Sequence, residues 1–329
     1  MWFEQLTGFR EDSPENVRKN ILISGTELIS LANNKRYHFG KLEIATLADL
    51  RQYNHVLEGY NDAIEISEIV ADAQILHCQP ENANALFQVA SQFNLLEMIS
   101  PNIIPEQGID RYENDHTQGP VCAIACGAGT LFRNYFAETN GQIGQTEHNQ
   151  IDCLDLIAKE LDNERLDLWK MRNGYAMISE RGLLTINKKI AQLSADDRED
   201  LKGKLKTGIQ WNTEVTLAAS KNRVSQIFCS ALPVAYCQTE PIYWESFARL
   251  ILEALYEFTL YVGMKNMIKH QSNVVYLTLV GGGAFGNEEY WIIDSMQKAF
   301  KKFKNVPLDV RIVSYGKSNK DIQQLLKEL

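Results

Sequence analysis

The glycine-rich stretch GGGAFG, residues 281–286, constrains the fold more than any other part of the sequence. The β-branched and aromatic run 274–280 precedes it, and apolar residues at helical spacing follow it from Trp291 to Phe303. The glycines therefore lie at a strand-to-helix turn. Such a turn points unpaired backbone N–H groups and the positive end of a helix dipole outward, and glycine leaves room for an anion. We expect a phosphate-bearing ligand at this turn.

The composition argues against several classes of partner. The net charge is −9, and acidic and basic residues are interspersed, so we expect no nucleic-acid partner. No apolar run reaches the roughly 20 residues needed to span a bilayer, and the first residues do not resemble a signal peptide. We therefore expect a soluble, intracellular, cytoplasmic protein that is not bound to a membrane.

The cysteine and histidine residues predict neither disulfides nor a metal site. The six cysteines form no CxxC pair, and several lie in apolar stretches, which is typical of reduced core thiols. Cysteines and histidines also lack the spacing of zinc ligands, so no metal is expected.

The order of elements predicts an α/β fold with three layers, a mixed sheet and a largely helical insertion. A capping box is expected at Ser194 and Asp197, and a polar hairpin around Asn33 and Asn34. Residues 121–136 fit either a tightly packed helix or a second glycine-rich phosphate loop. The expected strands are 20–23, 85–90, 211–218, 224–233, 274–280 and 308–314, and the other expected helices are 46–56, 64–71 and 244–261.

The whole chain, 1–329, is predicted to form one elaborated domain. Within it, 1–75 is interpreted as an N-terminal extension and about 140–222 as the mostly helical insertion. The proline- and glycine-rich segment 100–120 excludes a regular helix, and long irregular loops of this kind are often functional.

The spacing of Gly281, Gly283 and Gly286 also matches GxGxxG, the fingerprint of a dinucleotide-binding Rossmann turn. That fold requires an acidic residue at the end of the next strand to hold a ribose. The strand 308–314 runs instead into Tyr315, and too few residues remain for the rest of such a domain. A purely structural turn is a further alternative, although four glycines and Phe285 exceed what a turn requires.

The sequence of a strand, GGGAFG, a long helix and a final strand resembles the closing third of a macrodomain. Upstream, VASQFNLLEM (89–98) resembles the strand and Asn-bearing loop of that family, and TQGPVCAIACGAG (117–129) resembles its glycine-rich loop and helix. The resemblance covers 85–316. It implies that the glycine loop wraps the diphosphate and distal ribose of ADP-ribose, with the aromatic residue beside that ribose.

The insertion resembles that of the larger branch of the family, which includes the poly(ADP-ribose) glycohydrolases, and the chain is similar to a subgroup also seen among bacterial effectors. The resemblance implies an ADP-ribosylhydrolase that needs no cofactor. The paired glutamates of the glycohydrolase signature, GGG followed by QEE, are not found. A mono-ADP-ribosyl linkage on protein is therefore the expected substrate.

Hydrolysis needs positioned carboxyl groups. Asp115, directly before the second glycine region, is the first catalytic candidate, and Glu97 and Glu106 are the next two. The resemblance implies that ADP-ribose is bound by Asn94, Gln118, Gly119, Gly281, Gly282, Gly283, Ala284, Phe285 and Gly286.

Two other functions are also compatible with the sequence. The same pocket could serve a reader module that binds ADP-ribosylated protein without turnover, and the glycine loop could serve an NAD-dependent oxidoreductase or transferase. His116 is left outside the catalytic set. A thiol nucleophile at Cys126 is disfavoured, because Cys122 and Cys126 share the spacing of one buried helix face.

Overall fold

The computed structural model of the protein describes residues 1–54, 59–60 and 62–329. Within these residues the central sheet has seven strands in the order β4-β11-β12-β6-β13-β14-β5. Strand β11 is antiparallel to both neighbours, and the pairs from β12 to β5 are parallel. The strands are β4 (Lys41–Thr46), β5 (Glu65–Val70), β6 (Leu86–Ala90), β11 (Lys206–Glu214), β12 (Arg223–Cys229), β13 (Val274–Leu277) and β14 (Asp309–Ser314).

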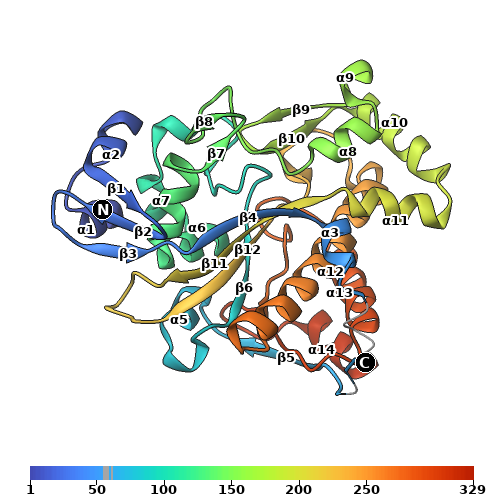
Figure 1. The fold of residues 1–329 in the computed structure, drawn as a ribbon. Helices are drawn as coiled ribbons and strands as arrows, with labels where there is room; N and C mark the ends of the chain where they lie inside the picture. Colours follow the sequence, from blue (N-terminus) through green and yellow to red (C-terminus); the bar gives the residue numbers. More distant parts are fainter. Residues whose placement is uncertain (55–58, 61) are drawn as a thin grey trace.

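Helices cover both faces of this sheet, as Figure 1 shows. The two faces of β6 illustrate the arrangement, because its successive side chains point in opposite directions. Gln88 donates to the Thr259 hydroxyl on one face at 2.8 Å, and Phe87 stacks on His77 on the other with 3.7 Å between ring centroids. The expected α/β fold with a mixed sheet between helical layers is confirmed.

The helices of the two layers come from different parts of the chain. The first layer includes α5 (Ala73–Cys78), α6 (Gln118–Ala125) and α7 (Gly127–Tyr135). The second includes α3 (Leu47–Arg51), α12 (Glu245–His270), α13 (Glu289–Lys302) and α14 (Lys320–Glu328). Helix α12 is buried along almost its whole length, because it packs between the sheet and further helices.

The remaining elements form the N-terminal part and the insertion. The N-terminal part comprises α1 (Trp2–Thr7), α2 (Pro14–Asn20), β1 (Ile21–Ser24), β2 (Glu27–Ser30) and β3 (Arg36–His38). The insertion comprises β7 (Glu138–Thr139), β8 (Gln142–Ile143), α8 (Asp155–Glu160), α9 (Asn163–Leu166), β9 (Trp169–Arg172), β10 (Tyr175–Ile178), α10 (Glu180–Ala191) and α11 (Ala195–Gly203). Short 3-10 turns are η1 (Pro80–Asn82), η2 (Pro105–Gln107), η3 (Asp110–Asn114), η4 (Val234–Tyr236) and η5 (Pro241–Tyr243).

Several local predictions are confirmed. The capping box of Ser194 and Asp197 opens α11, and β2 and β3 form the hairpin around Asn33 and Asn34. Residues 121–136 form helices, so the alternative of a phosphate loop there is wrong. Gly127 and Gly129 allow α7 to pack closely: a Cβ on Gly129 would lie 3.0 Å from the Thr213 hydroxyl of β11.

Other local predictions need correction. The helix expected at 64–71 is the edge strand β5, because its β-branched residues pair along β14 from Glu65 to Val70. The predicted insertion also supplies a strand of the central sheet, β11, together with the β9–β10 hairpin. The predicted extension 1–75 supplies both edge strands, β4 and β5. The helix expected at 46–56 begins as α3, and residues 55 and 56 lie outside the described residues.

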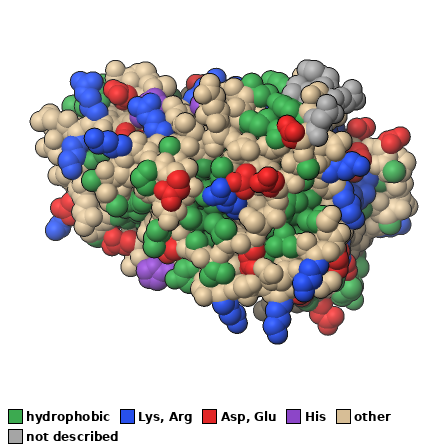
Figure 2. Space-filling view, turned by 90° about the horizontal axis from the view of Figure 1, so that it is seen from below, with side chains coloured by type: hydrophobic (Ala, Val, Ile, Leu, Met, Phe, Trp, Pro, Cys, Tyr) green, Lys and Arg blue, Asp and Glu red, His purple; other side chains and the backbone are tan. Residues whose placement is uncertain are grey.

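The charges at the surface are mixed. Figure 2 shows Lys and Arg side chains interspersed with Asp and Glu on the face that it displays. Among the described residues, no helix combines the length and the apolar character needed to cross a membrane.

Two buried glutamates on α12 connect the surrounding helices. Glu253 is paired with Arg198 at 2.6 Å and Lys298 at 2.7 Å, and Glu257 is paired with Arg51 at 2.7 Å. Burial alone would raise the pKa of each carboxyl, but hydrogen bonds from these cations outweigh burial and lower it. The pairs therefore favour the ionised form in the folded protein.

We expect Glu253→Gln to lower the free energy of unfolding by about 1–3 kcal/mol at neutral pH, because it leaves cations without their carboxylate. The lowered pKa of Glu253 means that this stabilisation is complete above the unfolded value of 4.5 and is lost as the pH falls through the folded value. Urea titrations of both proteins at pH 7 and pH 3 measure the difference in the free energy of unfolding. The exposed Glu164→Gln is the control, and equal stability of both variants at pH 7 would contradict the prediction.

Candidate functional site

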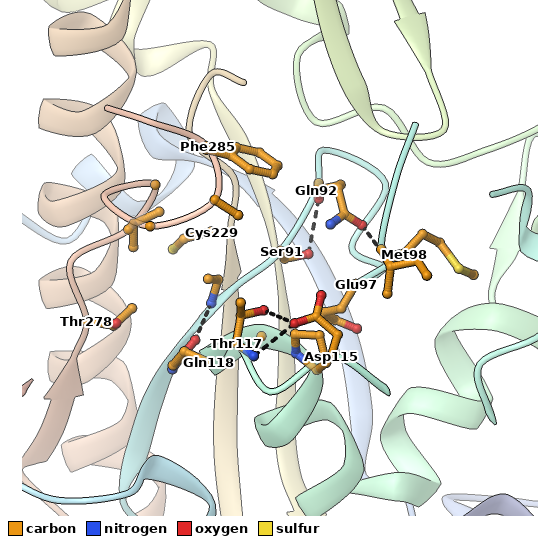
Figure 3. Close-up of a pocket in the computed structure, with 18 of the residues that line it drawn as sticks. Ser91, Gln92, Glu97, Met98, Asp115, Thr117, Gln118, Cys229, Thr278 and Phe285 are labelled. Atoms are coloured by element: carbon orange, nitrogen blue, oxygen red, sulfur yellow. Dashed lines mark hydrogen bonds between the residues drawn. The ribbon is translucent and has the colours of Figure 1, made fainter. Parts of the chain in front are cut away.

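A pocket lies at the carboxyl ends of β6, β12 and β13 (Figure 3). After β6 the chain leads through α6 and α7 towards β12, whereas after β13 it leads through α13 to β14 on the other side. Neighbouring parallel strands whose following loops diverge leave a crevice between them, and this is where open α/β sheets bind ligands. The topology alone therefore marks this pocket as the candidate site.

The glycine loop after β13 forms one wall of the pocket, and its glycines serve different purposes. Gly281 and Gly286 have φ values of +78° and +70°, and a Cβ on either would come within 2.8 Å of Ala231 or Ala235. The fold itself therefore requires both. A Cβ on Gly283 would meet no atom within 4 Å, and Gly283 lines the pocket. Its lack of a side chain leaves space for a ligand.

Backbone donors of this loop are free to bind an anion. Within the described part of the chain, no hydrogen bond uses the N–H groups of Gly283 and Ala284. Asn287 holds the base of the loop, since its side chain donates to the carbonyl oxygens of Leu232 at 2.8 Å and Gly281 at 3.4 Å. Asn287 thus fixes the base of the loop, while the backbone N–H groups of Gly283 and Ala284 stay open towards the pocket.

The start of α6 forms the opposite wall. The first N–H groups of a helix have no partner within it, and Gln118 and Gly119 in the first turn both line the pocket. The Gln118 side chain is not free for a ligand, because it accepts from the Ala90 N–H at 2.7 Å and donates to the Gln88 carbonyl at 2.8 Å. It extends the hydrogen bonding of β6. In Figure 3 a dashed line marks the hydrogen bond that the Gln118 side chain accepts.

Two of the three predicted carboxylates line this pocket. Asp115 is half-buried, and its carboxylate accepts from the N–H and hydroxyl of Thr117 at 2.9 and 2.7 Å. Glu97 is only 1% exposed and lies beside the start of α6, since a Cβ on Gly119 would approach its Cγ to 3.2 Å. Burial raises the pKa of Glu97 to about 7, although the buried Arg133 opposes this rise.

Other predicted residues lie elsewhere. Glu106 lies outside the set of pocket-lining residues, and its carboxylate accepts from the Glu147 N–H at 2.9 and 3.0 Å. Asn94 is fully buried in the turn after β6, where it accepts from the Leu96 N–H and donates to Gln150. Gly282 and Gly286 belong to the glycine loop but do not line the pocket, whereas Gly281, Ala284 and Phe285 do.

Sequence reasoning missed an aromatic wall. Tyr175 from the insertion and Tyr236 from η4 both pack around Phe285, with ring centroids 5.2 and 5.6 Å from it. The Tyr175 hydroxyl donates to the Met98 carbonyl at 2.7 Å, which ties the insertion to the loop after β6. The dipeptide Asn173-Gly174 is a hairpin signal, but nothing local indicates that the hairpin reaches this pocket.

The described residues contain no group of histidine, cysteine, aspartate and glutamate side chains suited to hold a metal ion. Cys126 is fully buried and burial raises its pKa, so the arrangement gives no support to a thiol nucleophile there.

Comparisons with known proteins find no matching family model and no matching curated sequence. Among solved structures, the chain is similar to poly(ADP-ribose) glycohydrolase from Deinococcus radiodurans in complex with ADP-ribose, with 10% identity, a TM-score of 0.47, and coverage of 88% of this chain and 94% of that chain. It is also similar to poly(ADP-ribose) glycohydrolase from Thermomonospora curvata bound to the inhibitor ADP-HPD, with 11% identity, a TM-score of 0.46 and 96% of each chain covered. Similarities this distant carry no functional conclusion.

Proposed function

We propose that the pocket between β6 and β13 binds ADP-ribose and that the protein hydrolyses a mono-ADP-ribosyl linkage on protein. The observation that carries this proposal is the meeting of two sets of backbone donors with two carboxyl groups in one pocket. The glycine loop and the start of α6 supply the donors, and Glu97 and Asp115 supply the carboxyls. A diphosphate with an attached sugar needs both kinds of group within reach.

Each part of the ligand has a matching part of the pocket. The diphosphate fits the N–H groups of Gly283 and Ala284 and the first turn of α6, where the dipole of the helix also favours negative charge. The aromatic wall of Tyr175, Tyr236 and Phe285 offers apolar faces to a ribose or a base. The sequence resemblance of both glycine regions to macrodomains supports the same ligand.

The two carboxyl groups occupy different environments, which suits them to different roles. Glu97 lies in the buried wall and has a raised pKa, so it can carry a proton near neutral pH. Asp115 is more accessible and is oriented by Thr117. Asp115 is therefore placed to orient a water molecule or to stabilise positive charge that develops on the ribose.

The preference for a mono-ADP-ribosyl linkage rests on the sequence, in which the paired glutamates of the glycohydrolase signature are not found. We also propose that the protein is similar to the bacterial effector subgroup, that it is cytoplasmic and that it forms a single domain. A reader module would use the same pocket without turnover. Use of NAD is disfavoured because the chain lacks an acidic residue at the end of β14 to hold a ribose.

Turnover tests the proposal. Proteins mono-ADP-ribosylated on arginine, acidic or serine residues, and ADP-ribose polymer, are incubated separately with the protein, and free ADP-ribose is measured. We expect release from at least one mono-ADP-ribosylated protein and slower release from polymer. Faster release from polymer would contradict the substrate preference, and binding without release from any substrate would favour the reader module.

Substitution of Gly283 tests the phosphate site. We expect Gly283→Glu to abolish ADP-ribose binding, because its carboxylate would occupy the open space in the pocket and repel the diphosphate. Gly283→Gln adds nearly the same volume without the charge, so the difference in calorimetric affinity between the two isolates the electrostatic part. A folded Gly283→Glu protein that binds like the wild type would exclude this loop as the phosphate site.

Substitution of Asp115 tests its catalytic role. We expect Asp115→Asn to lower single-turnover release by about a hundredfold or more, the usual scale for loss of a positioned acid or base, with far less effect on ADP-ribose affinity. Glu106→Gln is the matched control, since that carboxylate lies outside the pocket. Wild-type turnover by Asp115→Asn would show that another group performs this step.

A further inference from the structure

Arg133, on α7, lies directly behind the Glu97 side chain. Its Nη2 is 3.5 Å from both carboxylate oxygens of Glu97, and its Nε donates to the Leu95 carbonyl at 3.0 Å. Its guanidinium carbon lies 3.7 Å above the centre of the Phe228 ring. Nη2 also donates to the Thr130 hydroxyl at 3.2 Å. These contacts fix the guanidinium so that it faces the one buried carboxyl group that lines the pocket among the described residues.

Stability alone does not explain this pair. Arg133 is 0% exposed and Glu97 is 1% exposed, and the desolvation of two charges commonly exceeds the gain from pairing them. The contact is also long for an ion pair, and Nη1 of Arg133 has no hydrogen-bond partner within the described part of the chain. A buried, incompletely satisfied arginine costs folding free energy, which suggests a role in the pocket.

Few other charged or titratable groups face Glu97. Tyr112 of η3 accepts from the Glu97 N–H at 2.9 Å, and the buried thiol of Cys122 lies on the neighbouring α6. Asp115 lies on the same pocket, and the next thiol, Cys126, lies near Arg133. Among these groups Arg133 carries the positive charge, and a smaller contribution that also lowers the pKa of Glu97 comes from a hydrogen bond with Tyr112.

We propose that Arg133 is a positioning residue that holds the Glu97 carboxyl group at the pocket wall, and that Glu97 exchanges a proton with the bound substrate. This inference rests on the proposed function. In the first step, the bond between the anomeric carbon and the acceptor atom breaks, and the proton of Glu97 moves to that acceptor atom. Water then adds its hydroxyl to the anomeric carbon, and its remaining proton returns to Glu97.

Arg133 controls the protonation of Glu97 in a predictable direction. Burial raises the pKa of Glu97, whereas the charge of Arg133, its hydrogen bond and a weaker hydrogen bond with Tyr112 lower it, which leaves it at about 7. Removing the charge of Arg133 must therefore raise the pKa further. If turnover requires protonated Glu97, the turnover rate falls as the pH rises through the pKa of Glu97. Replacing Arg133 should therefore move this loss of turnover to higher pH.

Arg133→Met and Arg133→Lys test the proposal. Lysine keeps the charge but not the planar fork, and it also provides a second variant if methionine prevents folding. Arg51→Met is the matched control, because Arg51 is a half-buried arginine paired with Glu257 and Glu199 and does not line the pocket. Each variant is measured by ¹³C NMR titration of labelled glutamate carboxyls, with the Glu97 signal assigned by its loss in Glu97→Gln.

We expect the Glu97 midpoint to rise by about one pH unit or more in Arg133→Met, less in Arg133→Lys, and not at all in Arg51→Met. Turnover of mono-ADP-ribosylated protein should fall by about tenfold or more in Arg133→Met, while the ADP-ribose Kd changes by less than about threefold. The high-pH fall in turnover should shift with the midpoint.

An unchanged Glu97 midpoint in a folded Arg133→Met or Arg133→Lys protein would overturn the inference. Equal losses in turnover and in ADP-ribose affinity would also overturn it, because they would indicate that Arg133 only maintains the shape of the pocket. Absence of turnover in the wild type contradicts the proposed hydrolysis and the proton exchange, whereas the titration still decides whether Arg133 controls Glu97.

Discussion

The contact between the start of α6 and the end of β6 is the constraint on which the pocket depends. The Gln118 side chain pairs with the backbone of β6 at Ala90 and Gln88, and Gly119 allows close approach, since a Cβ there would lie 2.1 Å from the Ala90 carbonyl oxygen. This contact brings the first turn of α6 to the carboxyl end of β6, opposite the glycine loop. Without it, the two sets of backbone donors would not face one pocket.

Some of the elements around this contact line the pocket, and others stabilise the fold that holds it. The insertion contributes Tyr175 to the aromatic wall, and α7 contributes Arg133 behind the pocket. The ion pairs of Glu253 and Glu257 join the buried helix α12 to the helices around it. Because the pocket residues come from segments far apart in the sequence, the site depends on the packing of the whole sheet and both helical layers.

The sequence predicted the features whose causes are local. The strand, glycine loop and helix around Gly283 form one continuous sequence pattern, and the four residues from Ser194 to Asp197 are enough to predict the capping box. By contrast, β5 was predicted as a helix because the pairing with β14 that makes it a strand involves residues far away in the chain. Gln118 was predicted to bind the ligand, and only the fold shows that the backbone of β6 occupies its side chain. Arg133 gave no local signal, because its partner Glu97 is separated from it by the whole irregular segment and α6.

The central claim is that the pocket between β6 and β13 recognises ADP-ribose, and isothermal titration calorimetry with ADP-ribose and NAD tests it most directly. We expect saturable binding of ADP-ribose at one site per chain and clearly weaker binding of NAD, because NAD carries a nicotinamide on the anomeric carbon of its distal ribose and the pocket would have to accommodate that extra ring. ADP-ribose binding should also raise the Tm, since a ligand that binds only the folded state stabilises it. No heat of binding and an unchanged Tm in millimolar ADP-ribose would contradict the account, as would tighter binding of NAD than of ADP-ribose.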